Sequence, residues 1–312
     1  MVTKLKIALA QLNPLVGDVI GNTKKLIDVR SKLDEDIDIL VAPELYISGY
    51  PIDDLVLRED FLDLVEKEIN NLAKITTDNK SAIIVGAPRK NANSIKNSVF
   101  VIEKGEIISV KDKHELPNTG VFDEQRIFEK GVLENCVKIK GVNFGLPICE
   151  DIWKETVLKK LSQSGAEIII AINASPFTIS KYDERNDVAL SRVKETKLPI
   201  VYLNRTGGQD ELIFDGSSFS LNYDGKKFSS LEEFKEDIST IHFEKNNGKW
   251  IGYGNVKENS SQSERLYKAL VLGLRDYVKN NKFSGVVLGL SGGVDSALVA
   301  ALSLIHISEP TR

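Results

Sequence analysis

Residues 144–151 read Phe-Gly-Leu-Pro-Ile-Cys-Glu-Asp, an apolar run that ends in three reactive side chains. The run has the length of a β-strand, and its first five residues are nearly all apolar, as expected for a strand buried on both faces. In open α/β sheets, active sites gather beyond the carboxyl ends of the strands. The stretch therefore predicts a buried sheet and, at its end, a candidate site around Cys149.

Similar apolar runs recur along the chain. The other predicted strands are residues 5–10, 37–42, 82–86, 98–102, 168–172 and 200–203. Between them lie helical patterns at residues 23–33, 61–74, 153–163 and 183–196. Strands that alternate with helices predict an α/β architecture. Residues 219–228, with Asp224-Gly225 at their centre, predict a β-hairpin with a tight turn.

The chain divides where its composition becomes polar. We predict a first domain over residues 1–245, a linker over residues 246–262 and the start of a second domain over residues 263–312. The second part contains a strand-like run, Val286 to Leu288, and a helix that begins near Ala297. Its first helix has an apolar face formed by Leu266, Leu270, Gly273, Leu274, Tyr277 and Val278.

The second part is short for a domain. So few residues with one strand cannot close a core alone, so we expect this domain to be truncated. After about residue 302 the sequence no longer continues a helical pattern, and Pro310 would stop a helix. We expect a foreign or frameshifted tail there.

Composition limits the class of protein. The chain has 312 residues, of which 42% are apolar and 28% charged, as in soluble globular proteins. A net charge of −4 gives no reason to expect binding to nucleic acid or to an anionic membrane. No apolar run approaches the length that spans a bilayer, and no signal peptide is evident. Two cysteines, three histidines and no zinc motif indicate a reducing, cytoplasmic location without structural zinc.

Three residues that follow apolar or charged runs suit amide hydrolysis. Cys149 is a candidate nucleophile, and Glu44 is a candidate base that takes the thiol proton and returns it to the leaving group. Lys113 would supply positive charge to the oxyanion. Each residue alone also fits a plainer role, as a buried core thiol, a helix start or part of a solvated loop.

The blocks around these residues resemble the three signature blocks of the nitrilase superfamily, in that family's order. They are Pro43-Glu44 with Ser48-Gly49-Tyr50-Pro51, then Lys113-x-x-Leu116-Pro117, and then Cys149-Glu150-Asp151-x-Trp153. The resemblance covers about residues 4–225. It implies a four-layer α-β-β-α sandwich in which Glu44 is the base, Lys113 the cation and Cys149 the nucleophile.

Further segments resemble the glutaminase domain of glutamine-dependent NAD synthetases. They are residues 49–55, residues 116–124 and Asn173-Ala174-Ser175-Pro176-Phe177 with Lys181. The resemblance implies that Thr119, Ser175 and Lys181 bind glutamine. The family commonly has Tyr at the position of Thr119, which keeps a hydroxyl but lacks the aromatic face. Taken locally, Ser175 also fits a turn and Lys181 a solvated cation.

A glycine-rich loop lies between the last predicted strand and helix. It comprises Gly289, Leu290, Ser291, Gly292, Gly293, Val294, Asp295 and Ser296. Its backbone N–H groups and the following helix N-terminus suit an anion, and it lacks the Lys of a Walker motif. The loop resembles the pyrophosphate loop of N-type ATP pyrophosphatases, which implies a doubly wound α/β domain. Asp295 either helps to hold Mg²⁺ or caps the helix.

Together the two resemblances imply an enzyme that forms NAD⁺. Glutamine would be hydrolysed at Cys149, and the ammonia would be used in the ATP- and Mg²⁺-dependent amidation of deamido-NAD⁺. We expect this chain to retain the glutaminase reaction only, and its family to form homo-oligomers. Two alternatives remain at this point, namely a stand-alone nitrilase-type amidase and a catalytically silent binding paralogue.

Overall fold

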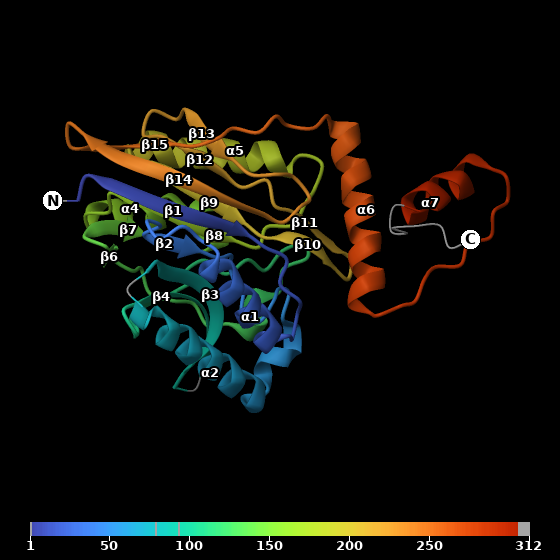
Figure 1. Cartoon of the computed structure of the whole chain (residues 1–312), viewed down its shortest axis with the longest axis horizontal. Coiled ribbons are helices and arrows are strands. Elements are labelled where there is room, and N and C mark those ends of the chain that lie inside the picture. Colours follow the sequence, from blue (N-terminus) through green and yellow to red (C-terminus); the bar gives the residue numbers. More distant parts are fainter. Residues whose placement is uncertain (1, 79, 93, 305–312) are drawn as a thin grey trace.

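The computed structural model describes residues 2–78, 80–92 and 94–304, and most of them form a four-layer sandwich. Two β-sheets face each other, and helices cover the outer face of each sheet (Figure 1). The predicted α/β class and the α-β-β-α layering are confirmed.

The first sheet has seven strands, in the order β15-β14-β1-β2-β3-β4-β5. Strands β1, β2 and β3 are parallel, and the other pairs are antiparallel. Two helices, α1 (Val19–Ser31) and α2 (Glu59–Ile75), pack on its outer face. The strands are β1 (Lys4–Gln11), β2 (Ile39–Val41), β3 (Ala82–Asn91), β4 (Ser94–Glu103), β5 (Glu106–Asp112), β14 (Asp237–Asn246) and β15 (Lys249–Tyr253).

The second sheet has six strands, in the order β13-β12-β9-β8-β7-β6. Strands β7, β8 and β9 are parallel, and the edges are antiparallel hairpins. Helices α4 (Glu155–Gln163) and α5 (Lys181–Thr196) cover its outer face. The strands are β6 (Val137–Ile139), β7 (Val142–Gly145), β8 (Ile168–Asn173), β9 (Ile200–Asn204), β12 (Phe219–Leu221) and β13 (Lys227–Ser230).

Strand β8 shows why its sequence is apolar throughout. Ile168, Ile170 and Ile172 point into the core between the two sheets, whereas Ile169 and Ala171 point into the layer under α4 and α5. Because successive side chains of a strand face opposite sides of the sheet, a strand that is covered by another layer on both sides has no solvent-exposed face. The apolar runs of the sequence are therefore the inner strands.

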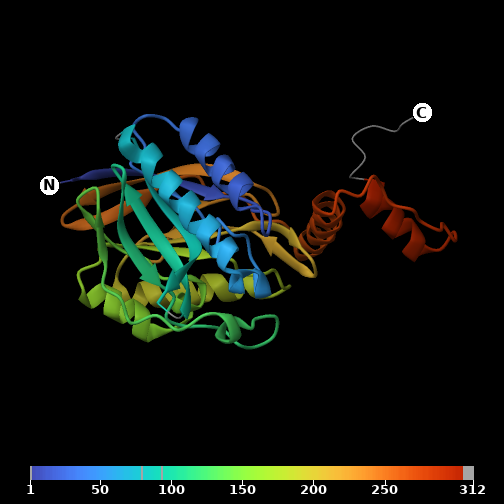
Figure 2. The ribbon, with the colours of Figure 1, turned by 90° about the horizontal axis from the view of Figure 1, so that it is seen from below.

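A hairpin and two helices extend one end of the sandwich. Strands β10 (Thr206–Gln209) and β11 (Leu212–Asp215) pair with each other, and helix α6 (Gln262–Asn280) packs on them. Helix α7 (Val294–Leu304) lies beyond α6, on the side away from the sheets (Figure 2). No helix in the described ranges combines the length and apolar character needed to cross a membrane.

Two sequence predictions for this end of the chain differ from the structure, and a third falls mostly outside the described residues. Residues 249–253, predicted as linker, form β15, because Trp250 is buried between the sheets. Residues 286–288 form no strand, and their side chains are exposed, since no neighbouring strand pairs with them within the described ranges. The predicted atypical tail falls largely on residues 305–312, which lie outside the described residues.

Helix α6 also turns a different face to the protein than its sequence predicts. It buries Ala269, Leu272 and Asp276, whereas Leu266 and Leu270 are exposed. Ala269 and Leu272 pack with Phe234, and Asp276 hydrogen-bonds into the hairpin. Choosing the buried face of α6 by hydrophobicity alone leaves out the carboxylate of Asp276, so the predicted face differs from the observed one.

Candidate active site

Glu44 lies just beyond the carboxyl end of β2 and is buried. Its Oε1 accepts hydrogen bonds from Lys113 Nζ at 2.7 Å and from Asn97 Nδ2 at 2.8 Å. Its Oε2 accepts one from the backbone N–H of Ala174 at 2.8 Å. These donors fix both oxygens and stabilise the ionised carboxylate in a site without bulk water.

Lys113 follows β5 and lies between two carboxylates. Its Nζ is 2.7 Å from Glu44 and 2.8 Å from Glu124, and all three side chains are buried. Burial opposes the charged form of Lys113, but the two carboxylates outweigh it and raise the pKa of Lys113 well above the usual range. Lys113 is therefore a fixed cation held inside the protein.

Cys149 lies after β7, at the first residue of the short 3₁₀-helix η3 (Cys149–Trp153). Its backbone is in the left-handed region, with φ of +47°, which is uncommon for a residue with a Cβ and is found at functional turns. Burial raises the pKa of the thiol well above the usual range, and Glu44 raises it further, while Lys113 opposes them. The thiol is therefore protonated at neutral pH, so it needs a base to react.

Asp151 ties the turn of Cys149 to the segment that follows Lys113. Its Oδ1 accepts from the backbone N–H groups of His114 at 3.1 Å and Glu115 at 2.7 Å. Its Oδ2 accepts from the N–H of Ile148 at 3.0 Å. The carboxylate thus keeps the lysine and the cysteine in register, and the sequence analysis assigned it no role.

Glu124 is a second residue to which sequence reasoning gave no role. It lies in the short helix α3 (Glu124–Ile127), and its Oε1 accepts from Lys113 Nζ at 2.9 Å and from the hydroxyl of Tyr50 at 3.2 Å. Burial raises its pKa to about 7, Lys113 lowers it and Glu44 raises it. Glu124 ends the segment of residues 116–124 that resembles the glutaminase domain, but nothing in its local sequence shows that this carboxylate is buried.

A cavity of about 630 Å³ opens beside the turn of Cys149. Glu150 and Trp153 line it from the Cys149 side, and Thr119 and Lys181 line it from the other segments. The structure thus brings two of the three predicted glutamine-binding residues to one cavity. Lys181 Nζ lies 4.3 Å from the centre of the Trp153 ring, which fixes the cation at the wall.

Ser175, the third predicted glutamine-binding residue, is buried and does not line this cavity. Its Oγ accepts from Arg185 Nε at 3.1 Å, and its backbone N–H donates to Asn204 Oδ1 at 2.9 Å. Arg185 is itself paired with the buried carboxylate of Asp215 at 2.8 Å. These contacts fix the position of Ser175, and so of the adjacent Ala174, whose backbone N–H donates to Glu44.

The predicted pyrophosphate loop, residues 289–296, lies outside the sandwich and is exposed for nearly its whole length. Ser291 Oγ donates to Ser296 Oγ at 3.0 Å, and Ser296 Oγ donates to the carbonyl of Gly293 at 2.9 Å. Gly292 has φ of +84°, which favours glycine. The loop leads into the N-terminus of α7, whose first N–H groups have no acceptor within the helix. This donor set suits a phosphate chain.

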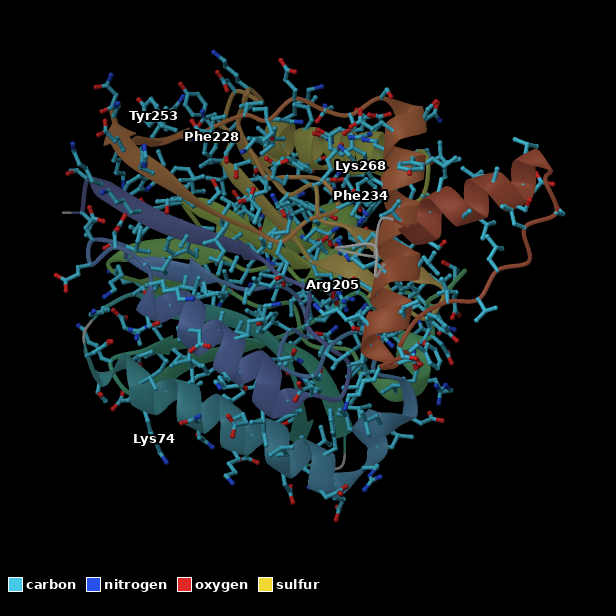
Figure 3. All side chains as sticks on the ribbon, turned by 45° about the vertical axis from the view of Figure 1, so that its right-hand side comes forward. Lys74, Arg205, Phe228, Phe234, Tyr253 and Lys268 are labelled. Carbon is cyan, nitrogen blue, oxygen red and sulfur yellow. The ribbon has the colours of Figure 1, made fainter. Side chains whose placement is uncertain are left out.

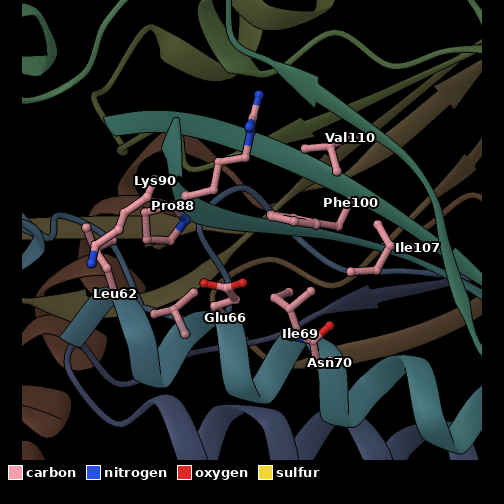
Figure 4. Close-up of a pocket in the computed structure, with 11 residues that line it drawn as sticks. Leu62, Glu66, Ile69, Asn70, Pro88, Lys90, Phe100, Ile107 and Val110 are labelled. Carbon is pink, nitrogen blue, oxygen red and sulfur yellow. The ribbon is translucent and has the colours of Figure 1, made fainter. Parts of the chain in front are cut away.

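A smaller cavity, of about 240 Å³, lies between α2 and strands β3 to β5 (Figure 4). Apolar side chains such as Ile69 and Phe100 form much of its wall. Cys149 and Lys113 are not among its lining residues, so it is separate from the candidate site. Within the described ranges, no group of three His, Cys, Asp or Glu side chains is placed to hold a metal ion.

Two segments of the chain match known protein families. The family model for carbon-nitrogen hydrolases matches residues 6–250, and the model for NAD synthases matches residues 266–310. Proteins named glutamine-dependent NAD(+) synthetase from Aquifex aeolicus and Rhodobacter capsulatus are 37% and 38% identical to this chain. The matches cover 96% and 97% of this chain and 58% and 55% of the relatives. The chain therefore spans somewhat more than half the length of these relatives.

Solved structures agree with the fold. A glutamine-dependent NAD+ synthetase from Acinetobacter baumannii, in complex with ADP, superposes with a TM-score of 0.92 at 36% identity. That match covers 97% of this chain and 57% of the other. A carbon-nitrogen hydrolase from Helicobacter pylori has a TM-score of 0.68 at 20% identity, covering 77% of this chain and 89% of that one, and shows the shared sandwich alone. On the match over residues 6–250 and the sandwich that these residues form, the chain belongs to the carbon-nitrogen hydrolase family.

Proposed function

We propose that this protein hydrolyses L-glutamine to glutamate and ammonia, with Cys149 as the nucleophile. The observation that carries the proposal is the buried arrangement of a thiol, a fixed carboxylate and a fixed cation beside a cavity of about 630 Å³. Each group is held by other buried residues rather than by solvent, so the site is preorganised.

The first half of the reaction follows from the protonation states. Glu44 takes the proton from Cys149 Sγ as the sulfur attacks the amide carbon of glutamine. Lys113 is close to the developing oxyanion and compensates its charge. Glu44 passes the proton to the amide nitrogen, and the C–N bond breaks. Ammonia departs, and a glutamyl thioester remains on Cys149.

Water completes the reaction. Glu44 takes a proton from the water as its oxygen attacks the thioester carbon, and the C–S bond breaks. The sulfur regains a proton, and glutamate leaves. The same three residues serve both halves, because attack by sulfur and attack by water build up negative charge on the same oxygen.

The walls of the larger cavity support an α-amino acid as substrate. Glu115 and Glu150 bring negative charge to the cavity, and Lys154 and Lys181 bring positive charge. A zwitterionic end of a substrate requires both signs, whereas a simple aliphatic amide requires neither. We propose that Thr119 and Lys181, which line the cavity, contact the substrate, and that the buried Ser175 supports the segment beside Glu44.

The purpose of the ammonia is a proposal of wider reach. The relatives are named glutamine-dependent NAD(+) synthetase, and the chain covers little more than half of their length. We propose that the ammonia serves ATP-dependent amidation of deamido-NAD⁺ in an enzyme of that length. There the loop of residues 289–296 would bind the phosphates of ATP with its N–H and hydroxyl donors, and Mg²⁺ would neutralise their charge. The two-domain division and the cytoplasmic location remain predictions from the sequence composition, and the homo-oligomer remains a prediction from the resemblance.

The test compares substrates. Ammonia release is measured from L-glutamine and, at equal concentration, from D-glutamine, L-asparagine and simple aliphatic amides. We expect L-glutamine to be preferred by at least about tenfold in kcat/KM, because aliphatic amides lack both charges and D-glutamine and L-asparagine differ in handedness or chain length. A preference for aliphatic amides would support a general amidase instead, and no reaction with any amide would support a silent paralogue.

A further inference from the structure

Arg205 is a buried arginine that lies between helix α6 and the candidate active site. It follows β9 directly, is inaccessible to solvent and, among the described residues, donates its hydrogen bonds to neutral acceptors. Figure 3 shows Arg205 where α6 meets the sandwich, with Lys268 further along the same helix. A buried arginine without a directly paired carboxylate is costly, so its contacts call for an explanation.

On one side, Arg205 holds Tyr50. Its Nη1 donates to the backbone carbonyl of Tyr50, and its guanidinium lies 4.3 Å from the centre of the Phe214 ring. Phe214 in turn packs edge-on against the Tyr50 ring, with the ring centres 6.2 Å apart. The hydroxyl of Tyr50 donates to Glu124, which contacts Lys113. The position of Tyr50 thus helps to fix the carboxylate of Glu124, which contacts Lys113.

On the other side, Arg205 is tied to α6. Its Nη2 donates to Asn13 Oδ1 at 3.1 Å, and Asn13 Nδ2 donates to Asp276 Oδ2 at 2.8 Å. The guanidinium can only donate and the carboxylate can only accept, so these two contacts fix the orientation of the Asn13 amide. Asp276 also accepts from the N–H of Gly208 at 2.8 Å.

Asp276 provides the nearby negative charge for Arg205 through this amide. Burial lowers the pKa of Arg205 to about 9, and Asp276 and Tyr50 oppose the shift. Asp276 lies in the segment that matches the NAD synthase model, whereas Arg205 and Tyr50 lie in the segment that matches the carbon-nitrogen hydrolase model. The contacts therefore run continuously from one matched segment into the catalytic centre of the other.

We propose that Arg205 is a positioning residue that couples the docking of α6, through Asn13 and Asp276, to the geometry of Tyr50, Glu124 and Lys113. When α6 is docked, Asp276 and Asn13 hold the guanidinium, and the guanidinium holds the backbone of Tyr50. Loss of this anchor frees Tyr50 to move away from Glu124. Glutamine hydrolysis is thereby made dependent on the segment that follows the sandwich. The inference rests on the proposed glutaminase function.

The experiment measures kcat and KM for glutamine per active site, with sites counted by titration with a diazoketone analogue of glutamine. A purely structural role of Arg205 would change the fraction of protein that is correctly folded. Counting active sites removes this effect from kcat. We expect Arg205→Met and Tyr50→Phe each to lower kcat per site roughly 10-fold, with KM within about twofold, because neither residue lines the substrate cavity. Arg205→Lys, which keeps the charge, should recover part of the loss.

The double variant Arg205→Met/Tyr50→Phe provides the decisive comparison. If Arg205 acts through Tyr50, the double variant is no slower than the slower single variant, because contacting residues in one network are not additive. Losses that multiply to roughly 100-fold would overturn the proposal, and so would an unchanged kcat per site in Arg205→Met. The control is Lys268→Gln on the same helix, whose side chain contacts Ser260 and Glu264 instead, and which should retain the wild-type rate.

Two further measurements keep the proposal testable. If Arg205→Met does not fold, Asp276→Asn keeps the shape and an acceptor but removes the charge. It should lower kcat per site a fewfold, and an unchanged value would overturn the proposal. If the wild type releases no ammonia from glutamine, the proposed function fails separately. The rate of Cys149 alkylation by iodoacetamide then decides, because equal rates in the wild type and Asp276→Asn would refute the coupling.

Discussion

Replacing Lys113 tests whether it neutralises two buried carboxylates. Its Nζ lies 2.7 Å from Glu44 and 2.8 Å from Glu124, and each contact corresponds to an attraction of about 6 kcal/mol at an effective dielectric of about 20. Most of this attraction offsets the desolvation of the three groups. Lys113→Met leaves two buried carboxylates without a cation, so we expect a loss of about 3–5 kcal/mol in unfolding free energy at alkaline pH.

Glu124→Gln is the matched comparison. It leaves Lys113 paired with Glu44 and keeps an acceptor in place, so we expect it to cost only about 1–2 kcal/mol. The order of the two variants follows from charge. At alkaline pH, with both carboxylates ionised, the group of three carries a net charge of −1 in the wild type, 0 in Glu124→Gln and −2 in Lys113→Met.

The pH dependence gives a further check. Lys113 lowers the pKa of Glu124, so in Lys113→Met that pKa lies above its wild-type value of about 7. At a pH between the pKa of Glu124 in the wild type and its higher pKa in Lys113→Met, Glu124 is protonated in the folded variant. At that pH, Glu124 is ionised in the folded wild type and in the unfolded chain. Over the range from pH 7 to 9, the deficit of Lys113→Met relative to the wild type is therefore largest at the alkaline end and shrinks by up to about 1.4 kcal/mol per pH unit as the pH falls to 7.

The assay is denaturant unfolding at pH 7, 8 and 9, followed by tryptophan fluorescence. Trp153 ends the short helix that begins at Cys149, so its emission reports on the site. The reasoning is refuted if Lys113→Met costs no more than Glu124→Gln, or if its deficit grows between pH 9 and pH 7.

Three other outcomes follow from the structure. Iodoacetamide should alkylate Cys149 slowly at pH 7 and faster beyond pH 9, because burial raises the pKa of its thiol. Peptide mapping would show Cys149 reacting after the more exposed Cys136. An alkylation rate of Cys149 that is already maximal at pH 7 would contradict this. Asp151→Ala strands three backbone donors and should cost about 3–6 kcal/mol, whereas Asp151→Asn retains an acceptor for two of them and should cost about 1–3 kcal/mol, as measured by urea unfolding; equal costs would argue against the tie. A Cβ on Gly86 would lie 2.4 Å from the backbone nitrogen of Leu45, next to Glu44, so Gly86→Ala should cost at least about 2 kcal/mol and slow ammonia release. Gly285→Ala, in open space, should do neither.

The layers and most inner elements could be predicted from sequence because burial on both faces leaves a local signal. The strand at Ile168 to Ile172 and the helix at residues 61–74 are examples, since their apolar spacing directly reflects the layers they contact. Residues 249–253 lacked such a signal. Only one large apolar side chain, Trp250, is buried in that edge strand, and its pairing partner is set by the sheet rather than by the local sequence.

Cys149, Glu44 and Lys113 were singled out through the signature blocks around them, and the structure brings all three segments together. The roles of nucleophile, base and cation are proposed for them. Glu124 and Asp151 were given no role, because a carboxylate in a polar segment has the same local sequence whether it is exposed or buried. Only the fold shows that one contacts Lys113 and the other holds three backbone N–H groups. Arg205 was missed for the same reason, since its partners come from segments distant in sequence.

The assignment of Cys149 as nucleophile is tested most directly by ammonia release from L-glutamine in the wild type, Cys149→Ala and Cys136→Ala. We expect Cys149→Ala to lose at least about 10³-fold in kcat, since no other thiol lies in the site, and Cys136→Ala to match the wild type. Acid quenching of the wild type during turnover should trap a glutamyl thioester on the peptide that contains Cys149, detected by mass spectrometry. Equal ammonia release by the wild type and Cys149→Ala would contradict the account.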